Sequence, residues 1–266
     1  MEVNEAIEEA HRRGILTTAS LMIGASEAAD AIGRARRLPS LRVGLHLVVV
    51  DGPLVLPAGD HPDFWGTQGD TLHLVRAGIR FFFSPKARRQ LEAEIRAQFQ
   101  AFKDTRLLLD HVNSHHHMHL HPTVFNILLK VGKEYGLRAV RLPYEPPIPS
   151  WQASRKALFR RLGVWIFLYP WITLLKSRLK GRNVCSNDFV FGMNDSGSMK
   201  LDLVLRLLKH LPDGVTEIYF HPTISRMDSL KKGSDFEKEL EALASPLVRQ
   251  TILASGIQRV GFGDLD

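Results

Sequence analysis

Cysteine is nearly absent: the chain of 266 residues contains one, Cys185. A single cysteine cannot form a disulfide within the chain or a cysteine-based zinc site, so nothing supports a secreted, disulfide-rich scaffold. The chain also lacks an uninterrupted apolar run of about 20 residues, the length that a membrane-spanning helix needs. Its twelve histidines are therefore the main metal-capable residues.

Acidic residues are outnumbered, with 28 Asp and Glu against 35 Lys and Arg, which gives a net charge of +7. A basic protein favours anionic partners, either nucleic acid or an anionic membrane surface. No stretch interleaves basic and aromatic residues in the way of nucleic-acid-binding segments, so we predict no nucleic-acid partner. The chain opens on an acidic amphipathic helix, so we expect no signal peptide and a cytoplasmic protein.

Helical and strand patterns alternate along the chain. Apolar spacing predicts a helix over Val3–Arg13, and Ser26 is the expected N-cap of a helix that ends near Arg37. The nearly continuous apolar run 41–50 is typical of a strand covered on both faces. The same reasoning predicts helices at 85–102, 122–136, 201–211 and 234–244, strands at 17–23, 107–114, 140–142, 216–220 and near Val260, and a loop over 52–69. This order predicts an α/β protein with a parallel sheet, open or closed into a barrel, whose ligands collect at the carboxyl ends of the strands.

The strongest chemical signal is a run of five histidines within seven residues, 115–121, between a predicted strand and a predicted helix. In extended backbone alternate residues share a face, so His115, His117 and His119 are expected on one side. Neutral imidazole is a common ligand of divalent cations, and the cluster predicts a metal or catalytic site. The alternative is a set of exposed loop histidines or hydrogen-bonded core histidines.

Two further histidines lie near strand ends. His46 interrupts an apolar strand, where its imidazole needs a partner or loses about 1–3 kcal/mol through desolvation. Alone it would be a core histidine, but beside a second histidine cluster metal ligation is the better interpretation. His221 closes the strand pattern Glu217–Phe220 and can serve as a general acid or base, or as a structural turn residue.

At these residues the sequence resembles the YdjC-like carbohydrate deacetylases. The motifs are the segments 3–7 (VNEAI), 17–22 (TTASLM), 44–47 (GLHL), 113–119 (NSHHHMH) and 217–222 (EIYFHP). The segments 81–85 (FFFSP) and 91–99 (LEAEIRAQF) resemble the hopanoid-biosynthesis-associated (HpnK-like) branch most closely. No single motif is specific, but their combination is.

The resemblance implies a distorted (β/α) barrel in which residues 1–266 form a single domain. It also implies a metal-dependent hydrolase that removes the N-acetyl group from an amino sugar, with a hopanoid glycolipid as the expected substrate. The implied cofactor is a divalent metal ion, Mg²⁺ or Zn²⁺, with which His46 and His115 match the two histidine ligands. His221 matches a position suited to protonating the leaving amine. The implied substrate contacts are His117, His119, Arg141 and Glu217.

One departure from the family pattern concerns the start of the chain. The family opens with a strand that ends in Asp-Asp-Phe-Gly and supplies a metal ligand and a catalytic base. Here Met1 and Glu2 fall just before the helix that follows this motif, so we expect the first strand and both carboxylates to be missing and the activity to be weak. Where some relatives carry Asp before the histidine run, this chain has Asn113. Two alternatives stay open: a non-catalytic, membrane-associated remnant, which the missing carboxylates favour, or a metal-dependent phosphoesterase, since histidine clusters at strand ends also serve phosphate chemistry.

Residues 155–182 form an apolar insert with basic flanks. Its central run 162–175 (LGVWIFLYPWITLL) is too short to span a bilayer, and Pro170 is expected to interrupt it. Trp165, Tyr169 and Trp171 are residue types that favour a membrane interface, and the flanking cations suit anionic headgroups. We predict peripheral docking at the inner membrane face, with a buried core helix as the alternative.

Overall fold

The computed structural model describes residues 1–57, 71–224 and 235–265. The chain divides into two compact units. The central unit is Thr18–Arg141, and the terminal unit combines Met1–Thr17 with Leu142–Asp266. This division does not test whether residues 1–266 form a single domain, which therefore stays a prediction.

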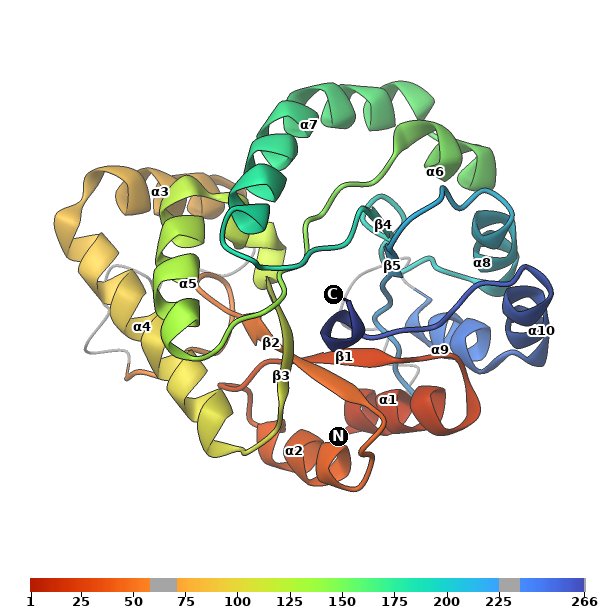
Figure 1. The fold of residues 1–266 in the computed structure, drawn as a ribbon, viewed down its shortest axis with the longest axis horizontal. Helices are drawn as coiled ribbons and strands as arrows, with labels where there is room; N and C mark the ends of the chain where they lie inside the picture. The colour runs from red at the N-terminus through yellow and green to blue at the C-terminus, as the bar shows by residue number, and fades with distance from the viewer. Residues whose placement is uncertain (58–70, 225–234, 266) are drawn as a thin grey trace. The chain divides into compact units, whose positions relative to one another are not determined.

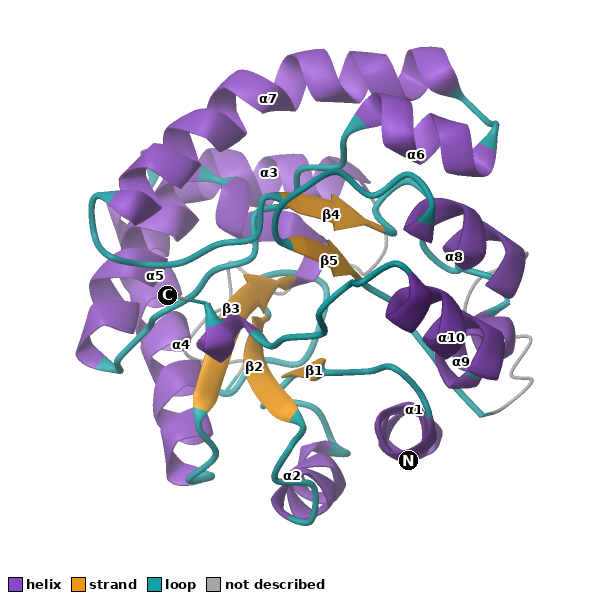
Figure 2. Ribbon diagram, turned by 45° about the vertical axis from the view of Figure 1, so that its right-hand side comes forward, coloured by secondary structure: helices purple, strands orange, loops and turns teal. Residues whose placement is uncertain are grey.

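The central unit is built on a parallel sheet. Its strands β1 (Thr18–Leu21), β2 (Arg42–Leu47) and β3 (Leu109–Ser114) lie in the order β1-β2-β3 (Figure 2). All the pairings are parallel, and His46 of β2 lies opposite Asn113 of β3. The strand predicted at 140–142 is reduced to one bridge between Val112 and Val140.

The helices of the central unit follow local sequence signals. In α4 (Pro85–Asp104) the Ser84 side chain accepts a hydrogen bond from the Ala87 N–H, and Pro85 occupies the first turn. Leu91, Ile95 and Phe99 form an apolar stripe of helical spacing that is buried in the core, and α4 lies beside α5 (Figure 1). The other helical elements are α2 (Ala28–Arg36), α3 (Thr71–Phe83), the 3-10 segment η2 (His115–Leu120) and α5 (Pro122–Glu134).

The terminal unit contains a second, smaller sheet. Its strands β4 (Phe189–Phe191) and β5 (Thr216–Ile218) pair in parallel. Phe191 of β4 is buried in one cluster with Val204, Ala242 and Val248. The helical elements are α1 (Glu2–Arg13), α6 (Pro147–Ser154), α7 (Leu158–Lys180), α8 (Leu201–Leu208), α9 (Phe236–Ala244), α10 (Pro246–Ala254) and the 3-10 turn η3 (Phe262–Asp264).

Several predicted boundaries need correction. Helix α2 begins at Ala28 with Glu27 as its N-cap and no side-chain cap, so the predicted Ser26 cap is wrong. The predicted strand near Val260 is wrong as well, because a 3-10 turn follows there. The apolar run 41–50 is extended only as far as Leu47, although the three valines that follow are buried. Most of the predicted loop 52–69, and the first residue of the helix predicted at 234–244, lie outside the described residues.

Helix α7 corrects the expectation that Pro170 interrupts the apolar insert. The helix is 23 residues long, Leu158–Lys180, and continues without a break through this proline. Proline removes one backbone donor and leaves the carbonyl of Ile166 without its helical partner. Ile166 and Pro170 are both exposed, so water can bond that carbonyl. The parallel pairing in both sheets confirms the predicted α/β class, while a closed barrel is not shown.

Candidate active site at the carboxyl ends of β2 and β3

Two imidazoles meet where β2 and β3 end. His46 is the fifth residue of β2, and His115 directly follows the last residue of β3. Because the strands are parallel neighbours, the two rings converge, with centroids 5.8 Å apart and planes at 73°. Burial, with smaller contributions from the nearby Arg141 and His115, lowers the pKa of His46 to about 3. His46 is therefore neutral near pH 7, the state in which an imidazole can bind a cation.

A chain of hydrogen bonds across all three strands supports His46. Its Nδ1 lies 2.6 Å from the side-chain amide of Asn113, and that amide lies 2.8 Å from Ser20 Oγ. Ser20 in turn lies 3.1 Å from Nε2 of His111, whose Nδ1 contacts Asp110 at 2.8 Å. Asn113, His111 and Asp110 are all buried. The network therefore holds His46 in one place from the interior of the sheet.

Gly44 makes room for this network. A Cβ atom at residue 44 would lie 2.5 Å from Cε1 of His111, closer than any real Cβ contact. Any side chain there would displace the His111 ring from Ser20. Gly44 is not among the residues with a left-handed φ, so backbone conformation does not require glycine there. The close approach of the His111 ring requires it instead.

The histidine run is not extended, so the expectation that His115, His117 and His119 share one face is wrong. The run folds into η2, with left-handed φ values of 50° at His116 and 53° at His117. The rings of His115 and His116 lie 4.1 Å apart, and those of His117 and His119 lie 6.1 Å apart. Non-glycine residues with such backbone angles are uncommon and cluster at functional sites.

His119 has a supporting position. It is fully buried, with Nδ1 2.7 Å from Ser114 Oγ and Nε2 2.9 Å from the backbone carbonyl of Arg141. Burial holds the pKa of His119 well below its usual range. With both ring nitrogens occupied, His119 is suited to fixing η2 rather than to contacting a substrate. The Arg141 guanidinium is buried as well and faces the amide of Asn113.

Asp51 joins this region, although the sequence reasoning missed it. It lies four residues beyond the end of β2, with a left-handed φ of 52° and a side chain 8% exposed. Its carboxylate is 3.6 Å from Nε2 of His116 and 3.7 Å from Nε2 of His73 in α3, and no side chain or backbone group of the described residues forms a hydrogen bond with its Oδ1. The available signal was an acidic residue directly after a buried apolar run at a strand end.

The terminal unit holds the other two predicted site residues. Glu217 lies in β5 opposite Val190 of β4. His221 follows that strand with an exposed side chain, and its Nδ1 is 3.4 Å from Ser196 Oγ. Its backbone N–H donates to Glu239 Oε2 at 2.6 Å.

Glu239 was also missed by the sequence reasoning. It is fully buried and accepts a second hydrogen bond, from the Met199 N–H at 3.1 Å. Burial raises the pKa of its carboxyl group. Nothing in the amphipathic pattern of this helix indicates that one of its glutamates is buried and accepts backbone hydrogen bonds.

The donor set can be tested against a divalent ion. Within residues 1–57, 71–224 and 235–265, no three His, Cys, Asp or Glu side chains are grouped so that they could hold a metal. His46 and His115 nevertheless supply two converging imidazoles, half of a tetrahedral set. The fit is therefore partial: these two residues would supply two ligands of a divalent ion, and the described residues supply no third.

The fold and the site together define an α/β protein with a histidine site at the ends of parallel strands. Residues 1–254 match the family of YdjC-like proteins, and the chain belongs to this family.

Two relatives align with almost the whole chain. One from Geobacillus stearothermophilus is 34% identical over 265 residues, with 98% of this chain and 91% of the relative aligned. One from Brevibacillus brevis is 28% identical over 268 residues, covering 99% of this chain and 94% of the relative. Both are named carbohydrate deacetylases.

The fold is also similar to a solved structure. The crystal structure of a proposed cellobiose-phosphate cleavage protein from Enterococcus faecalis V583 matches with a TM-score of 0.74. The match covers 99% of this chain and 93% of that one at 20% sequence identity. At that identity the likeness supports the fold alone.

Proposed function

We propose that this protein is a carbohydrate deacetylase that hydrolyses the N-acetyl group of an amino sugar. In this reaction water adds to the acetyl carbonyl, the C–N bond breaks, and acetate and a free amine leave. The observation that carries the proposal is the pair of converging imidazoles at the ends of β2 and β3, one of which is held neutral by burial. The names of the full-length relatives support the same chemistry.

The proposed cofactor is a divalent cation, held by His46 and His115. When bound, such a cation supplies polarisation of the acetyl carbonyl and a lowered pKa of a bound water. Imidazole ligands favour Zn²⁺ over Mg²⁺, which prefers oxygen ligands. Two protein ligands are fewer than a stable zinc site normally has, so we expect weak affinity and activity that depends on added metal.

The remaining roles belong to this chain's own side chains. We assign to His221 the donation of a proton to the leaving amine, since its ring is exposed and its backbone is anchored by Glu239. Arg141, His117 and Glu217 are proposed to contact sugar hydroxyls. His119 is given the supporting role that its two hydrogen bonds indicate.

Acetate release from N-acetylglucosaminides tests this function. The chain is stripped with a chelator and reloaded with Zn²⁺, Mg²⁺ or no metal. We expect acetate only with metal, with activity lost in His46→Gln and kept in His210→Gln, a histidine outside the site. Phosphate release from phosphoesters without acetate release would favour the phosphoesterase instead. Neither activity at saturating metal would favour the non-catalytic remnant.

We further propose that the substrate is a hopanoid glycolipid and that α7 docks on the membrane that carries it. Among the helices of the described residues, α7 is the one that is long and apolar enough to cross a membrane. Only 17% of its most apolar stretch is buried within the protein. Phe159 is 88% exposed and Phe167 is 83% exposed, on one face of a helix that contains no acidic residue. Such an apolar face between exposed cations suits an anionic lipid surface.

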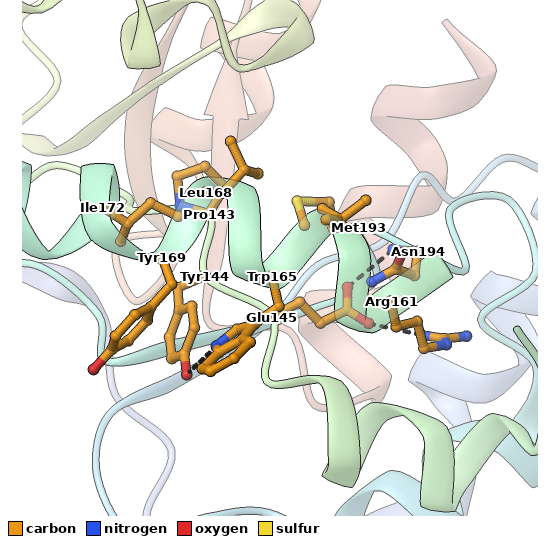
Figure 3. A pocket seen from close by; sticks show the side chains of 11 residues that line it. Pro143, Tyr144, Glu145, Arg161, Trp165, Leu168, Tyr169, Ile172, Met193 and Asn194 are labelled. Carbon is orange, nitrogen blue, oxygen red and sulfur yellow. Dashed lines mark hydrogen bonds and ion pairs between the residues drawn. The ribbon is translucent and has the colours of Figure 1, made fainter. Parts of the chain in front are cut away.

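The inner face of α7 favours docking along the surface over crossing it. Arg161 is buried and pairs with Glu145 at 3.1 Å and with Asp195 at 2.8 Å. Trp165 Nε1 donates to the Tyr144 hydroxyl at 3.0 Å (Figure 3). These contacts turn Trp165 away from solvent, so Phe159 and Phe167 replace it as the proposed membrane contacts. The pocket along this face, about 10 Å³, has room for about one water molecule and not for a sugar ring.

Vesicle co-sedimentation tests the docking. The full chain is expected to bind vesicles that contain anionic phospholipid, more weakly as salt is raised. Phe159→Ser with Phe167→Ser should abolish binding, and Leu247→Ser with Leu253→Ser, an exposed apolar pair on α10, should not. Equal binding by both double variants would remove α7 as the docking surface. Acetate release from a water-soluble N-acetyl sugar would still report the enzyme's chemistry.

A further inference from the structure

Helix α3 of the central unit presents an apolar face to solvent. Its inner side chains Ala77 and Phe81 are buried, and the helix packs on α4 and α5 (Figure 1). At about 100° per residue, four other apolar side chains fall within an arc of about 100° on the opposite side. All four are at least half exposed: Val75 54%, Ile79 54%, Phe82 50% and Phe83 72%.

The chain around this apolar face is basic. From Thr71 to Leu91 it contains no Asp or Glu and five cations. On helical spacing, Arg76 and Arg80 follow one edge of the apolar face. Exposed apolar side chains bordered by cations are typical of a helix that lies in the interface of an anionic lipid bilayer. The five cations, all exposed, are Arg76, Arg80, Lys86, Arg88 and Arg89.

Two of these arginines border a pocket at the start of α4. The pocket has a volume of about 270 Å³, many times the space of one water molecule. It contains one carboxylate, that of Glu92, which lies 2.6 Å from Lys130 Nζ. Guanidinium groups match the geometry of phosphate, so the pocket is suited to the phosphate of a lipid headgroup. Its lining residues are Arg88, Arg89, Glu92, Thr123, Asn126 and Ile127.

Helix α3 also lies against the end of the histidine run, within the same unit. The ring of His121 is 6.1 Å from that of Phe81 and 6.3 Å from that of Phe82. A Cβ atom on Gly78 would lie 3.5 Å from Cδ2 of His121. A surface that binds α3 is therefore close to η2, which begins at His115.

We propose that α3 and the first turns of α4 form a docking surface for an anionic membrane, with the exposed apolar face in the lipid interface and Arg88 and Arg89 at lipid phosphates. A second copy of the chain fits this surface less well, because two basic faces would repel each other. The inference goes beyond the proposed docking of α7, since it concerns a surface of the central unit and does not depend on the reaction.

A fluorescent probe on the apolar face tests the contact directly. The full chain carries Ile79→Cys with Cys185→Ser and is labelled with nitrobenzoxadiazole, whose emission shifts to the blue in an apolar environment. We expect this shift with vesicles that contain phosphatidylglycerol and not with phosphatidylcholine alone. The matched control is Leu108→Cys in the same background, since Leu108 is 84% exposed and precedes β3 at the other end of the strand. Its probe should not shift.

Three results would overturn the proposal. The first is no shift at residue 79 with phosphatidylglycerol, and the second is an equal shift with phosphatidylcholine alone. The third is a probe that is already blue-shifted without vesicles, or becomes so as the protein concentration is raised. In that case the chain itself, or a second copy of it, covers the apolar face.

Vesicle titration of charge variants tests the arginines. Arg88→Gln with Arg89→Gln should weaken binding to phosphatidylglycerol vesicles on the order of tenfold. Lys133→Gln with Arg138→Gln removes two exposed cations elsewhere on the same unit and should change binding much less. Equal losses in the two variants would mean that net charge, and not the surface of α3 and α4, controls binding.

The labelled chain that also carries Phe159→Ser and Phe167→Ser separates this surface from α7. At a lipid concentration above that used for sedimentation, the probe at residue 79 should still shift. Loss of the shift would mean that α3 does not bind lipid on its own and would overturn the inference. A retained shift in a protein that releases no acetate from any N-acetyl sugar would support the docking surface and reject the proposed function.

Discussion

His46 lies inside a parallel strand of a packed sheet, whereas His221 follows a strand at an exposed turn. The ring of His46 contacts Asn113 through Nδ1, and burial keeps it neutral. The ring of His221 meets water, and its backbone N–H is the group held by a buried glutamate. One residue type therefore occupies two different environments: a buried, neutral ring inside the sheet, and an exposed ring at a turn.

The largest effect is expected at His46. Replacement by Gln keeps a polar side chain of similar size but removes the imidazole lone pair, and it should lower kcat/KM by about 10³ or more, because stabilisation by a cation is worth several kcal/mol. Steady-state acetate release with added Zn²⁺ measures this. His210→Gln is the matched control. A change in kcat/KM of less than about tenfold would mean that His46 is a core histidine without a role in the reaction. The functional contrast between His46 and His221 would then be wrong.

His221→Gln should lower kcat by about 10²–10⁴, the usual contribution of a general acid. KM and thermal stability should change little, since the side chain is exposed. The pH profile of kcat should lose the limb that the acid contributes. An unchanged profile with reduced stability would make His221 a structural turn residue instead.

Glu239→Ala tests whether the backbone anchor of His221 is structural. The variant leaves the N–H groups of His221 and Met199 without their acceptor, and it should destabilise the protein by about 2–4 kcal/mol. Urea denaturation measures the loss. Glu241→Ala, an exposed glutamate on the same helix, is the control and should change stability by less than about 0.5 kcal/mol. Equal losses of stability in the two variants would mean that Glu239 does not anchor the backbone of His221.

The smallest expected effect is a pH dependence of stability that arises from His46. Its pKa is near 3 in the folded protein against 6.5 for a free imidazole, so the unfolded chain takes up the proton first. Its contribution to stability is therefore complete above pH 6.5 and is lost progressively as the pH falls toward 3. At about pH 5, metal-free His46→Gln should show a shallower acid limb in its melting temperature, by a few degrees. Superimposable curves would show that His46 is not desolvated.

The fold was predictable where local pattern and burial agree. The helix at Pro85–Asp104 carries its Ser84 cap and its apolar stripe within one stretch of chain, so both are visible without a structure. The unbroken helix through Pro170 was not predictable, because it depends on the exposure of one carbonyl to water. Glu239 and Asp51 were missed because their partners come from distant segments.

The sequence by itself determined the alternation of helices and parallel strands, the placing of histidines at the strand ends, and membership of the family. These features depend on local periodicity and residue type. Only the tertiary structure decided what each histidine nitrogen can do. His119 has both nitrogens bonded, His46 has its Nδ1 2.6 Å from the Asn113 amide, and His221 is exposed to water. The physical reason is that burial and hydrogen-bond direction are set by neighbours far apart in the chain, which no local pattern records.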